Sequence, residues 1–377
     1  MHTKPRILFV LHLPPPVHGA AMVGKCIHDS ERVNGAFDCH YVNLTTAQNL
    51  EDIGKGGLKK LMAFARKLLE IRRTIKNTKP EAVYVTPNTA GGPFYKDFVV
   101  VQLCKWWSKR KVILHFHNKG VSTRQDRWLD DRLYRWFFRN AEVILLGKPL
   151  YEDIKRYVKE EQVHYCPNGI PDSGYVYTER TNEVPHILWL TNIMLTKGLM
   201  EYLDALAILK KQGVRFVADF VGGTTVEVSE AQFKTALRER GLQDCTHYAG
   251  KKYGQEKEAF FCRADLFVLP SYTEAFPLTI LEAMQHGLPV VATNVGGISI
   301  AVEQGVNGLL VGGDRPIMTL TYRPDAQELA DNLRILLTDM GLRTKMGLAG
   351  LKKYQSDLTL QCFEERFVEA ICHCLPT

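Results

Sequence analysis

Residues 263–297 read RADLFVLPSYTEAFPLTILEAMQHGLPVVATNVGG, and this stretch decides the fold class. The apolar run at 265–269 is typical of a buried strand. A helix is expected after the following loop, because Pro277 favours the first turn of a helix and Gly287 the position just past its end. The apolar run at 289–292 predicts the next buried strand. Strands that alternate with helices in this way are typical of a parallel sheet covered on both faces.

The same alternation of short apolar runs and helical patterns extends through the rest of the chain. It is interrupted by a polar stretch at 171–185, which we interpret as a linker between two doubly wound α/β domains at 1–170 and 186–357. Ligands of such open sheets bind beyond the carboxyl ends of the strands, so the loops after the strands are the places to search. Strands are expected at 6–11, 82–85, 111–115 and 143–146 in the first domain and at 186–190, 216–221, 266–269, 289–292 and 309–311 in the second.

The size and composition of the chain agree with two globular domains. Its 377 residues exceed the usual length of one compact α/β domain, and its 45% hydrophobic and 24% charged residues are ordinary. No apolar run reaches the ~20 residues of a membrane-spanning helix. The apolar stretch at 7–13 is short and interrupted by His12, so it does not resemble a signal peptide. The nine cysteines form no C-x-x-C pair, which favours reduced thiols and a cytoplasmic location.

The positive charge of the chain is concentrated in its first half. The net charge is +7, and nine Lys or Arg residues but only one acid, Glu70, lie at 55–79. Apolar residues recur there at helical spacing, which predicts a basic amphipathic helix, and basic segments with aromatic residues follow at 105–111 and 124–139. Two interpretations remain open, a solvated helix face over the core and a peripheral contact with an anionic membrane. Nucleic acid is disfavoured as a partner, since no binding motif accompanies the charge.

Two glutamates flank the expected start of the helix in 263–297. Glu274 lies on the loop side and Glu282 inside the helix. The N-terminus of a helix offers free N–H groups and the positive end of its dipole, which suits a phosphate. A loop carboxylate beside it can accept hydrogen bonds from sugar hydroxyls, and a helix carboxylate can hold a ribose in the same way. From spacing alone, the alternative of two solvated surface glutamates remains open.

The whole stretch resembles the donor-site signature of glycosyltransferase family 4, a family of retaining enzymes with the GT-B fold. It carries the pattern E-x7-E, followed by H-G-x-P-V-V-A and a Gly-Gly turn. The resemblance implies an α/β GT-B architecture of two Rossmann-like, doubly wound parallel-sheet domains that face a cleft, with a last helix at 358–377 that crosses back to the first domain. It assigns Glu274 to the transferred sugar and Glu282 to the nucleotide ribose. It also assigns to the sugar and diphosphate the backbone N–H groups of Phe276, Leu278 and Thr279.

A second match is 188–198, LWLTNIMLTKG, where an expected strand ends and a helix begins. The resemblance makes Lys197, at the start of that helix, the cation that neutralises the diphosphate leaving group. Members of the family usually carry an arginine five residues before this lysine, and Asn192 stands there instead. They also often carry a glutamate at the position of Ile300. At these two positions the chain departs from the donor-binding pattern of the family.

Three further positions resemble donor-binding loops of the family. Gly19, in the loop PPPVHGAA at 14–21, resembles the N-terminal glycine loop that lies under the donor phosphates. This loop is not a G-x-G-x-x-G fingerprint, so a nicotinamide cofactor is disfavoured. Gly222, after the strand at 216–221, corresponds to a loop near the phosphates, and Lys252 to a position near the base.

A pair of histidines ends one strand of the first domain. Alternation along the strand places His115 and His117 on the same face, with His117 nearer the expected cleft. His117 resembles the family residue that contacts the donor sugar near the reacting carbon. A histidine at the end of a strand is more often structural, and this is the interpretation that we favour for His115.

The resemblance implies a retaining hexosyltransferase that moves a sugar from a nucleotide-diphosphate sugar, with a UDP-sugar favoured, to a hydroxyl of a saccharide acceptor. Because no protein nucleophile is evident, we expect same-face attack by the acceptor hydroxyl, without a bound metal or another cofactor. The basic helix suggests a lipid-linked saccharide at the inner face of the plasma membrane, in polysaccharide or cell-envelope glycan assembly. Two alternatives remain, a sugar-nucleotide epimerase of the same fold and a non-catalytic nucleotide-sugar or glycan-binding subunit.

Overall fold

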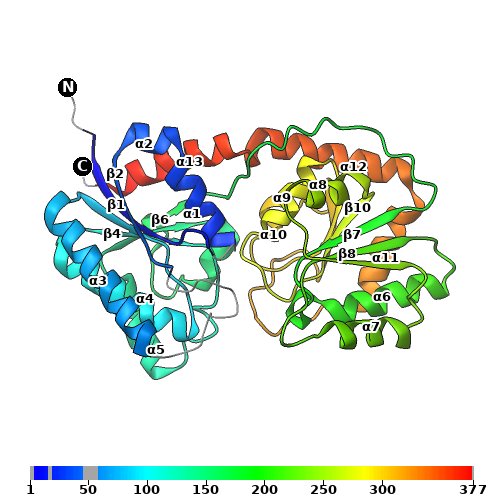
Figure 1. Ribbon diagram of the computed structural model, residues 1–377, viewed down its shortest axis with the longest axis horizontal. Coiled ribbons are helices and arrows are strands. Elements are labelled where there is room, and N and C mark those ends of the chain that lie inside the picture. Colours follow the sequence, from blue (N-terminus) through cyan, green and yellow to red (C-terminus); the bar gives the residue numbers. More distant parts are fainter. Residues whose placement is uncertain (1–3, 16–18, 46–57, 376–377) are drawn as a thin grey trace. The chain divides into compact units, whose positions relative to one another are not determined.

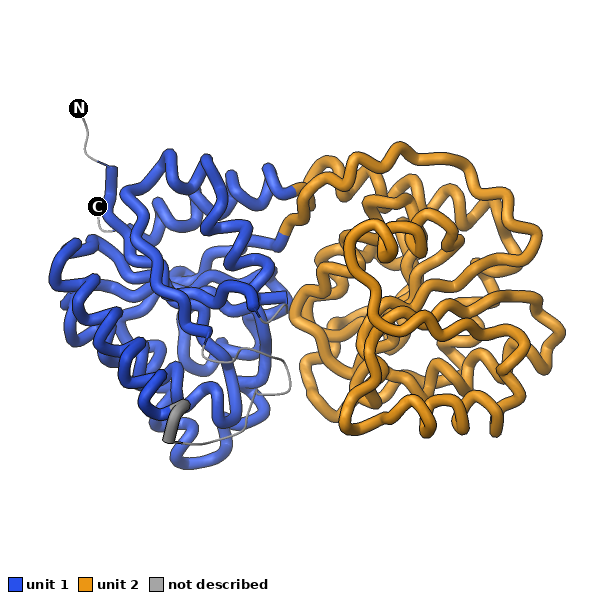
Figure 2. The backbone as a smooth tube through the Cα atoms, in the orientation of Figure 1, with its two compact units in different colours: residues 1–168, 360–377 blue, residues 169–359 orange. Residues whose placement is uncertain are grey.

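The computed structural model describes residues 4–15, 19–45 and 58–375. The chain forms two compact units, unit 1 (Met1–Asn168 with Leu360–Thr377) and unit 2 (Gly169–Thr359), which Figure 2 shows in two colours. Each unit is built around one six-stranded parallel sheet. Along the chain, unit 2 is therefore inserted between two pieces of unit 1.

Unit 1 has helices on both faces of its sheet, whose strand order is β2-β1-β3-β4-β5-β6. The strands are β1 (Arg6–Leu11), β2 (Asp38–Asn43), β3 (Ala82–Val85), β4 (Val112–Phe116), β5 (Ala141–Leu145) and β6 (Val163–Tyr165). Helices α3 (Leu58–Thr78), α4 (Gly91–Ser108) and α5 (Trp128–Phe138) cover one face. Helices α1 (Gly19–Asp29), α2 (Glu31–Ala36) and α13 (Leu360–Cys374) cover the other (Figure 1). Burial on both faces explains why β3 and β4 are buried along their whole length.

Unit 2 repeats the design with the strand order β12-β11-β10-β7-β8-β9. Its core centres on the rings of Trp189, Tyr202 and Phe220, whose centroids lie 5.2 to 5.8 Å apart. The strands are β7 (His186–Leu190), β8 (Val217–Val221), β9 (Thr246–Gly250), β10 (Leu266–Leu269), β11 (Val290–Thr293) and β12 (Gly308–Val311). The helices are α6 (Leu199–Lys211), α7 (Glu230–Glu239), α8 (Gly254–Arg263), α9 (Leu278–Gln285), α10 (Ile298–Ala301), α11 (Ala326–Thr338) and α12 (Met340–Lys353).

All the strands expected from the sequence are present, with bounds that agree within two residues. Three further strands, β2, β6 and β9, were not predicted, and each lies at the edge of its sheet. An edge strand has one neighbour and less cover, so its sequence lacks a continuous apolar run. In β2 only Val42 is buried, and in β9 no residue is.

The polar stretch 171–185, expected to be a linker, lies within unit 2. Arg180 Nη2 donates to the carbonyl of His286 at 2.6 Å, and Asn182 Nδ2 donates to Asp265 Oδ2 at 2.8 Å. Just before it, Ile170 pairs with Thr359 in an isolated parallel bridge, and Ile170 N donates to Leu358 O at 3.1 Å. The chain therefore enters and leaves unit 2 side by side.

The last helix, α13, belongs to unit 1, although it follows unit 2 in the sequence. The ring of Phe367 lies 6.3 Å from that of Phe9 and 5.4 Å from that of Tyr84, measured between centroids. Phe367 is fully buried by these contacts. The helix thus supplies part of the core that covers β1 and β3.

The expected basic helix is α3, and its apolar residues divide into two groups. Ile71 and Ile75 are buried against the core, as the first interpretation requires. Leu61, Met62 and Leu69 are instead 63%, 47% and 50% exposed, so one side of the helix presents apolar residues to solvent. None of the helices in the described ranges combines the length and the apolar character that crossing a bilayer requires.

Candidate active site

The carboxyl edge of the unit 2 sheet brings Lys197 and Glu274 together. Lys197 ends a short 3-10 turn (Leu195–Lys197) after β7, and Glu274 lies in the loop after β10. Because β7 and β10 are neighbours in the sheet, these loops meet, and Lys197 Nζ donates to Glu274 Oε1 at 2.6 Å. Ser271 Oγ donates to the same oxygen at 2.9 Å. Both charged side chains are partly buried, 25% exposed for Lys197 and 13% for Glu274.

Gly198 determines how closely the Lys197 turn approaches the Glu274 loop. Its φ of 75° lies in the left-handed region, and a Cβ built on it would lie 1.9 Å from the carbonyl oxygen of Pro270. A backbone hydrogen bond of 2.9 Å from Tyr272 N to Thr196 O joins the same two loops. A side chain at position 198 would push them apart and separate Lys197 from Glu274.

Helix α9 places its N-terminus directly after the Glu274 loop. Its N-cap residue is Pro277, which has no side-chain acceptor for the first-turn amides. The N–H groups of Leu278 and Thr279, both partly exposed, therefore suit an anion. Phe276 is 5% exposed and fixes the loop against the core. Phe276, Leu278 and Thr279 are the three backbone positions that the family resemblance assigns to the donor.

Glu282 lies one turn further along α9 and forms its own ion pair. Its Oε1 accepts from Lys257 Nζ of α8 at 2.6 Å, and both side chains are about one-fifth exposed, at 21% and 22%. Lys197 and Lys257 thus each hold one of the two glutamates of the E-x7-E pattern. Lys257 was not predicted as a site residue, because nothing in the local sequence of α8 indicates which strand or helix it contacts.

The Gly-Gly turn after β11 closes the site from the other side. A Cβ on Gly297 would lie 2.1 Å from the carbonyl oxygen of Ala275, so glycine lets this turn touch the Glu274 loop. The same Cβ would lie 3.0 Å from Cδ1 of Ile300. An apolar side chain therefore occupies the place beside the loop where the family pattern has a carboxylate.

The neighbouring loops after β7 and β8 contain Asn192 and Gly222. Asn192 is exposed, and a Cβ on Gly222 would lie 2.0 Å from the carbonyl oxygen of Thr191. A 2.8 Å hydrogen bond from Ile193 N to Gly223 O continues this contact. The structure thus brings together the loops of Asn192 and Gly222, two positions that the resemblance assigns to the donor independently.

Of the two lysines near these loops, Lys251 and Lys252, the structure places the first against the glycines. A Cβ on Gly223 would lie 2.1 Å from Cε of Lys251, whose side chain therefore lies over that residue. Lys252 Nζ is paired with Glu256 Oε1 at 2.9 Å. Lys251 is thus the lysine that lies over this glycine, and the assignment of Lys252 to a position near the base stays a prediction.

Two further residues near Glu274 give no signal in the sequence. Tyr272 donates its hydroxyl hydrogen bond to Glu201, with oxygen distances of 2.7 and 2.9 Å. Burial and the neighbouring Glu201 raise the pKa of Tyr272 above its ordinary value, so the hydroxyl stays protonated. The guanidinium carbon of Arg323 lies 5.7 Å from the centre of the Tyr272 ring. Arg323 follows β12 and is thus a second cation at the same edge of the sheet.

In unit 1, His115 and His117 lie on one face as alternation predicts, with ring centroids 4.2 Å apart. His115 is fully buried, and its Nδ1 lies 2.7 Å from the hydroxyl of Tyr84. Burial and the neighbouring His117 hold the pKa of His115 well below its ordinary value, so it stays neutral. His117 is partly exposed in the loop after β4. Gly19 is the exposed first residue of α1, and 16–18 of its loop lie outside the described residues.

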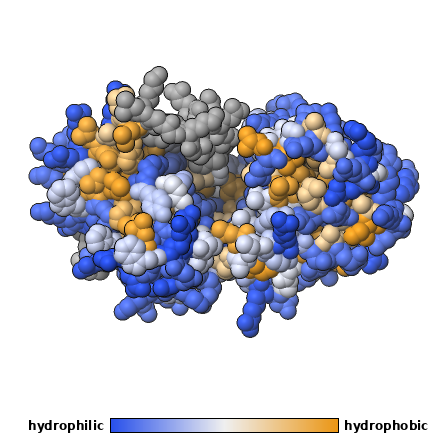
Figure 3. All heavy atoms as spheres, turned by 90° about the horizontal axis from the view of Figure 1, so that it is seen from below, coloured by the Kyte–Doolittle hydropathy of each residue, from blue (hydrophilic) through white to orange (hydrophobic). Residues whose placement is uncertain are grey.

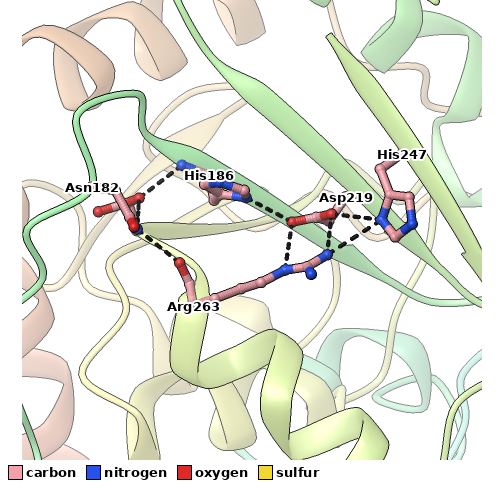
Figure 4. Close-up of polar contacts among 6 residues, drawn as sticks. Asn182, His186, Asp219, His247 and Arg263 are labelled. Carbon is pink, nitrogen blue, oxygen red and sulfur yellow. Dashed lines mark hydrogen bonds and ion pairs between the residues drawn. The ribbon is translucent and has the colours of Figure 1, made fainter.

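A buried carboxylate with three partners lies elsewhere in unit 2. Asp219 of β8 accepts from His186 and His247 at 3.0 Å each and from Arg263 Nε at 3.1 Å (Figure 4). Asn182 bonds to the Arg263 carbonyl at 2.9 Å beside this cluster. His186 is the first residue of β7, so the cluster lies towards the amino ends of the strands. It is therefore a structural connection between β7, β8, β9 and α8, away from the donor loops.

In the part of the chain that the structure describes, no group of three or more His, Cys, Asp or Glu side chains is arranged to hold a metal ion. The groups near Glu274 that carry positive charge are Lys197, Arg323 and the first turn of α9.

Residues 184–339 match the family model described as glycosyl transferases group 1. The amylovoran biosynthesis glycosyltransferase AmsK of Erwinia amylovora is 29% identical over 238 residues, which are 60% of this chain and 58% of that protein. The chain thus spans less than two thirds of this relative. The sucrose-phosphate synthase of Thermosynechococcus elongatus has a TM-score of 0.74 at 17% identity, over 98% of each chain. Anabaena HepE in complex with UDP has a TM-score of 0.72 at 18% identity, over 97% of this chain and 99% of that one. These two structures share the GT-B fold with this chain.

Proposed function

We propose, from the match of residues 184–339 to the family model of glycosyl transferases group 1, that the chain is a retaining glycosyltransferase. It moves a sugar from a nucleotide-diphosphate sugar to a hydroxyl of a saccharide acceptor in polysaccharide biosynthesis. Unit 2 binds the donor and unit 1 the acceptor. The observation that carries the proposal is the contact of Lys197 and Ser271 with Glu274, directly before the uncapped start of α9.

The geometry of this site supports a division of roles. The amides of Leu278 and Thr279 bind the diphosphate, and Lys197 stabilises the negative charge that develops on it as the bond to the sugar breaks. Glu274 accepts hydrogen bonds from hydroxyls of the transferred sugar. Glu282 holds the ribose, and Lys257 keeps its carboxylate oriented.

We propose that the acceptor hydroxyl attacks the anomeric carbon on the face from which the diphosphate departs. The bond between that carbon and the phosphate oxygen breaks, the bond to the acceptor oxygen forms, and the acceptor proton passes to the departing phosphate. Glu274 forms no covalent bond to the sugar in this scheme, and Lys197 and Ser271 hold its carboxylate in place through Oε1. His117 of unit 1 is the side chain to which the resemblance gives a role at the transferred sugar.

A uridine diphosphate sugar is the donor that we propose, supported by the likeness of the fold to Anabaena HepE, a structure that contains UDP. The test is a thermal-shift screen of the full chain with UDP, GDP, ADP and their sugar conjugates. UDP compounds should raise the melting temperature and the others should not. A larger shift with GDP or ADP compounds would overturn the choice of base.

The role of Glu274 is tested by Glu274→Gln, which keeps the shape of the side chain and removes its charge. Turnover should fall by about 10²-fold, while the affinity for the donor changes little, since the charge acts on the transition state. The matched control is Glu179→Gln, at an exposed glutamate of unit 2. Donor hydrolysis and transfer to saccharide acceptors are both measured, and unchanged turnover would remove Glu274 from the site.

Arg323 is the residue that we propose as the second cation at the diphosphate, in place of the arginine that Asn192 replaces. Arg323→Ala should weaken UDP binding about tenfold, and the double variant Asn192→Arg, Arg323→Ala should recover most of it. Lys345→Ala, at an exposed lysine of α12, is the control. If UDP binding is the same with and without Arg323, the guanidinium serves only to cover Tyr272.

We propose that transfer needs no metal ion or other cofactor, because Lys197, Arg323 and α9 already supply positive charge to the diphosphate. Treatment with a chelator followed by gel filtration should leave turnover unchanged. Loss of turnover that Mg²⁺ or Mn²⁺ restores would contradict this part of the proposal.

The acceptor that we propose is a lipid-linked saccharide at the cytoplasmic face of the membrane. The support is the surface of unit 1, where Trp106, Trp128 and Trp136 are 71%, 73% and 59% exposed among basic residues of α4 and α5. Figure 3 shows apolar side chains among hydrophilic ones on this side of unit 1. Tryptophan at such a surface suits the headgroup level of a bilayer. Equal sedimentation with neutral and anionic vesicles would contradict the membrane contact.

A further inference from the structure

The C-terminal ends of α3 and α4 in unit 1 enclose a depression of about 410 Å³. Ile75 and Pro80, both buried, form its apolar floor. Trp107 and Ser108 of α4 form one wall, and the guanidinium carbon of Arg72 lies 6.0 Å from the centre of the Trp107 ring. Because α3 and α4 lead into the amino ends of β3 and β4, the depression is distinct from the loops at the carboxyl edge.

Four cations line this depression, and among the residues that the structure describes no acid pairs with them. They are Arg72, Lys76, Lys79 and Arg110, all exposed. Among the described residues, none of the four forms an ion pair, and no acid lines the space. The nearest acid along α3, Glu70, is paired with Lys67 at 2.9 Å.

Helix dipoles account for only part of this charge. The C-terminus of a helix carries roughly half a negative charge, so the ends of α3 and α4 together offset about one of the four cations. About three positive charges therefore remain around one space. Such an arrangement favours a bound anion with more than one oxygen, of which a phosphate is the common example.

The face of α3 that leads to the depression is apolar. Leu61, Ala65 and Leu69 are exposed and follow one another at four-residue spacing, and the same stripe continues through Arg72 and Lys76. Residues three and four apart share one side of a helix, so the stripe is apolar at one end and basic at the other. A ligand with a phosphate group beside hydrocarbon matches both ends, whereas a free phosphate matches only the basic end.

We propose that this depression binds the phosphate of an anionic phospholipid headgroup, while the exposed leucines of α3 contact the adjoining acyl chains. The inference rests on the membrane contact proposed above and names the lipid group that the contact recognises. The phosphate lies among Arg72, Lys76, Lys79 and Arg110, and the Trp107 ring covers it from the side. This site is separate from the donor site of unit 2.

The test compares vesicles of equal zeta potential, containing phosphatidic acid, phosphatidylglycerol or oleate in phosphatidylcholine. The full chain should bind the two phospholipid vesicles at least tenfold more tightly than the oleate vesicles. Equal binding to all three would show that diffuse charge alone attracts the protein, and would overturn the proposal.

The double variant Arg72→Glu, Arg110→Glu should lose this preference. The control Lys211→Glu, Lys345→Glu makes the same change of net charge at exposed lysines of unit 2 and should bind within twofold of the native chain. Equal loss in both variants would overturn the proposal. If the first variant unfolds by circular dichroism, Lys76→Gln, Lys79→Gln takes its place.

Two further measurements distinguish a lipid site from a site for a soluble anion and from an effect on the donor site. Millimolar inorganic phosphate should not displace the chain from phosphatidic acid vesicles, and complete displacement would assign the site to a soluble anion instead of a lipid. The thermal shift with UDP should be the same in all these variants, because UDP is proposed to bind unit 2. If UDP does not shift the melting temperature of the native chain, the donor proposal fails, and the vesicle result still tests the lipid proposal independently.

Discussion

At the scale of single residues, glycines decide how closely the donor loops approach one another. Gly198, Gly222 and Gly297 each face a carbonyl oxygen at a distance that no Cβ can accept, between 1.9 and 2.1 Å. The sequence showed a Gly-Gly turn and a glycine after a strand, but the partner carbonyls belong to other loops. Such contacts are tertiary, so local patterns predict the glycine without predicting what it touches.

Gly198→Ala should weaken the binding of UDP by displacing Lys197, although it removes no group that contacts the donor. Alanine at a φ of 75° is strained by about 1 to 2 kcal/mol, and its Cβ would also meet the Pro270 carbonyl. Gly213→Ala is a matched control, since Gly213 has a φ of 76° and nothing within 4 Å of the added carbon. Urea denaturation and UDP affinity are measured for both. Equal effects on UDP affinity would mean that the close approach at Gly198 does not position Lys197.

Asp219 should make stability depend on pH in the acid range. Burial by itself would raise the pKa of Asp219, but hydrogen bonds from His186 and Arg263 outweigh it and hold this pKa below its ordinary value. The carboxylate therefore stabilises the fold above the unfolded-state pKa of about 3.9, and this contribution declines as the pH falls through the folded-state pKa. Urea denaturation between pH 2 and 7 measures the decline.

Asp219→Asn should remove that acid-range decline and cost about 2 to 3 kcal/mol at pH 7, because Arg263 loses a charged acceptor. Asp244→Asn is the comparison, since Asp244 pairs with Lys210 but is 72% exposed, so its loss should change the free energy of unfolding far less. If the free energy of unfolding falls equally at acid pH in the native chain and in the Asp219→Asn variant, other carboxyl groups control the decline.

At the scale of elements, the sequence predicts all the interior strands but, of the four edge strands, only β12, which is buried along its whole length. The buried strands β3 and β10 were found with the bounds that the structure has, because burial on both faces demands an unbroken apolar run. The edge strand β9 has none. For the site, the E-x7-E pattern located Glu274 and Glu282 on a loop and a helix. Their partners Lys197 and Lys257 depend on which strands are neighbours, which the sequence does not state.

Helix α3 has two kinds of apolar residue, and mutation should separate them. Ile75→Ala should destabilise unit 1 by about 2 to 4 kcal/mol, because it leaves a cavity in the core. Leu61→Ala should change stability by less than about 0.5 kcal/mol, since Leu61 is 63% exposed. Urea denaturation followed by circular dichroism measures both. A large loss with Leu61→Ala would mean that this side of α3 is covered in the folded protein.

At the scale of the whole molecule, the sequence order and the spatial order of the chain differ. Unit 1 is completed by α13, which comes after all of unit 2. Phe367→Ala should therefore weaken the N-terminal strands, although it lies near the end of the chain, by about 3 to 5 kcal/mol. Amide hydrogen exchange should show faster exchange in β1 and β3 and unchanged exchange in β7 and β8.

Phe233→Ala provides the reverse case, because Phe233 is buried in the core of unit 2. It should accelerate exchange in β8 and β9 and leave β1 unaffected. If either variant speeds exchange in both units equally, the two sheets unfold as one cooperative block.

Unit 2 is an insertion whose two ends meet at the bridge between Ile170 and Thr359. Its first and last residues are neighbours, so the segment between them can be excised without leaving a wide gap for a splice to span. A gene in which a short glycine linker joins Asn168 to Leu360 should therefore encode unit 1 with its own last helix in place. The excised piece, 169–359, retains its whole sheet and both glutamates. Donor binding by the piece 169–359 and acceptor binding by the joined unit 1 can then be screened separately.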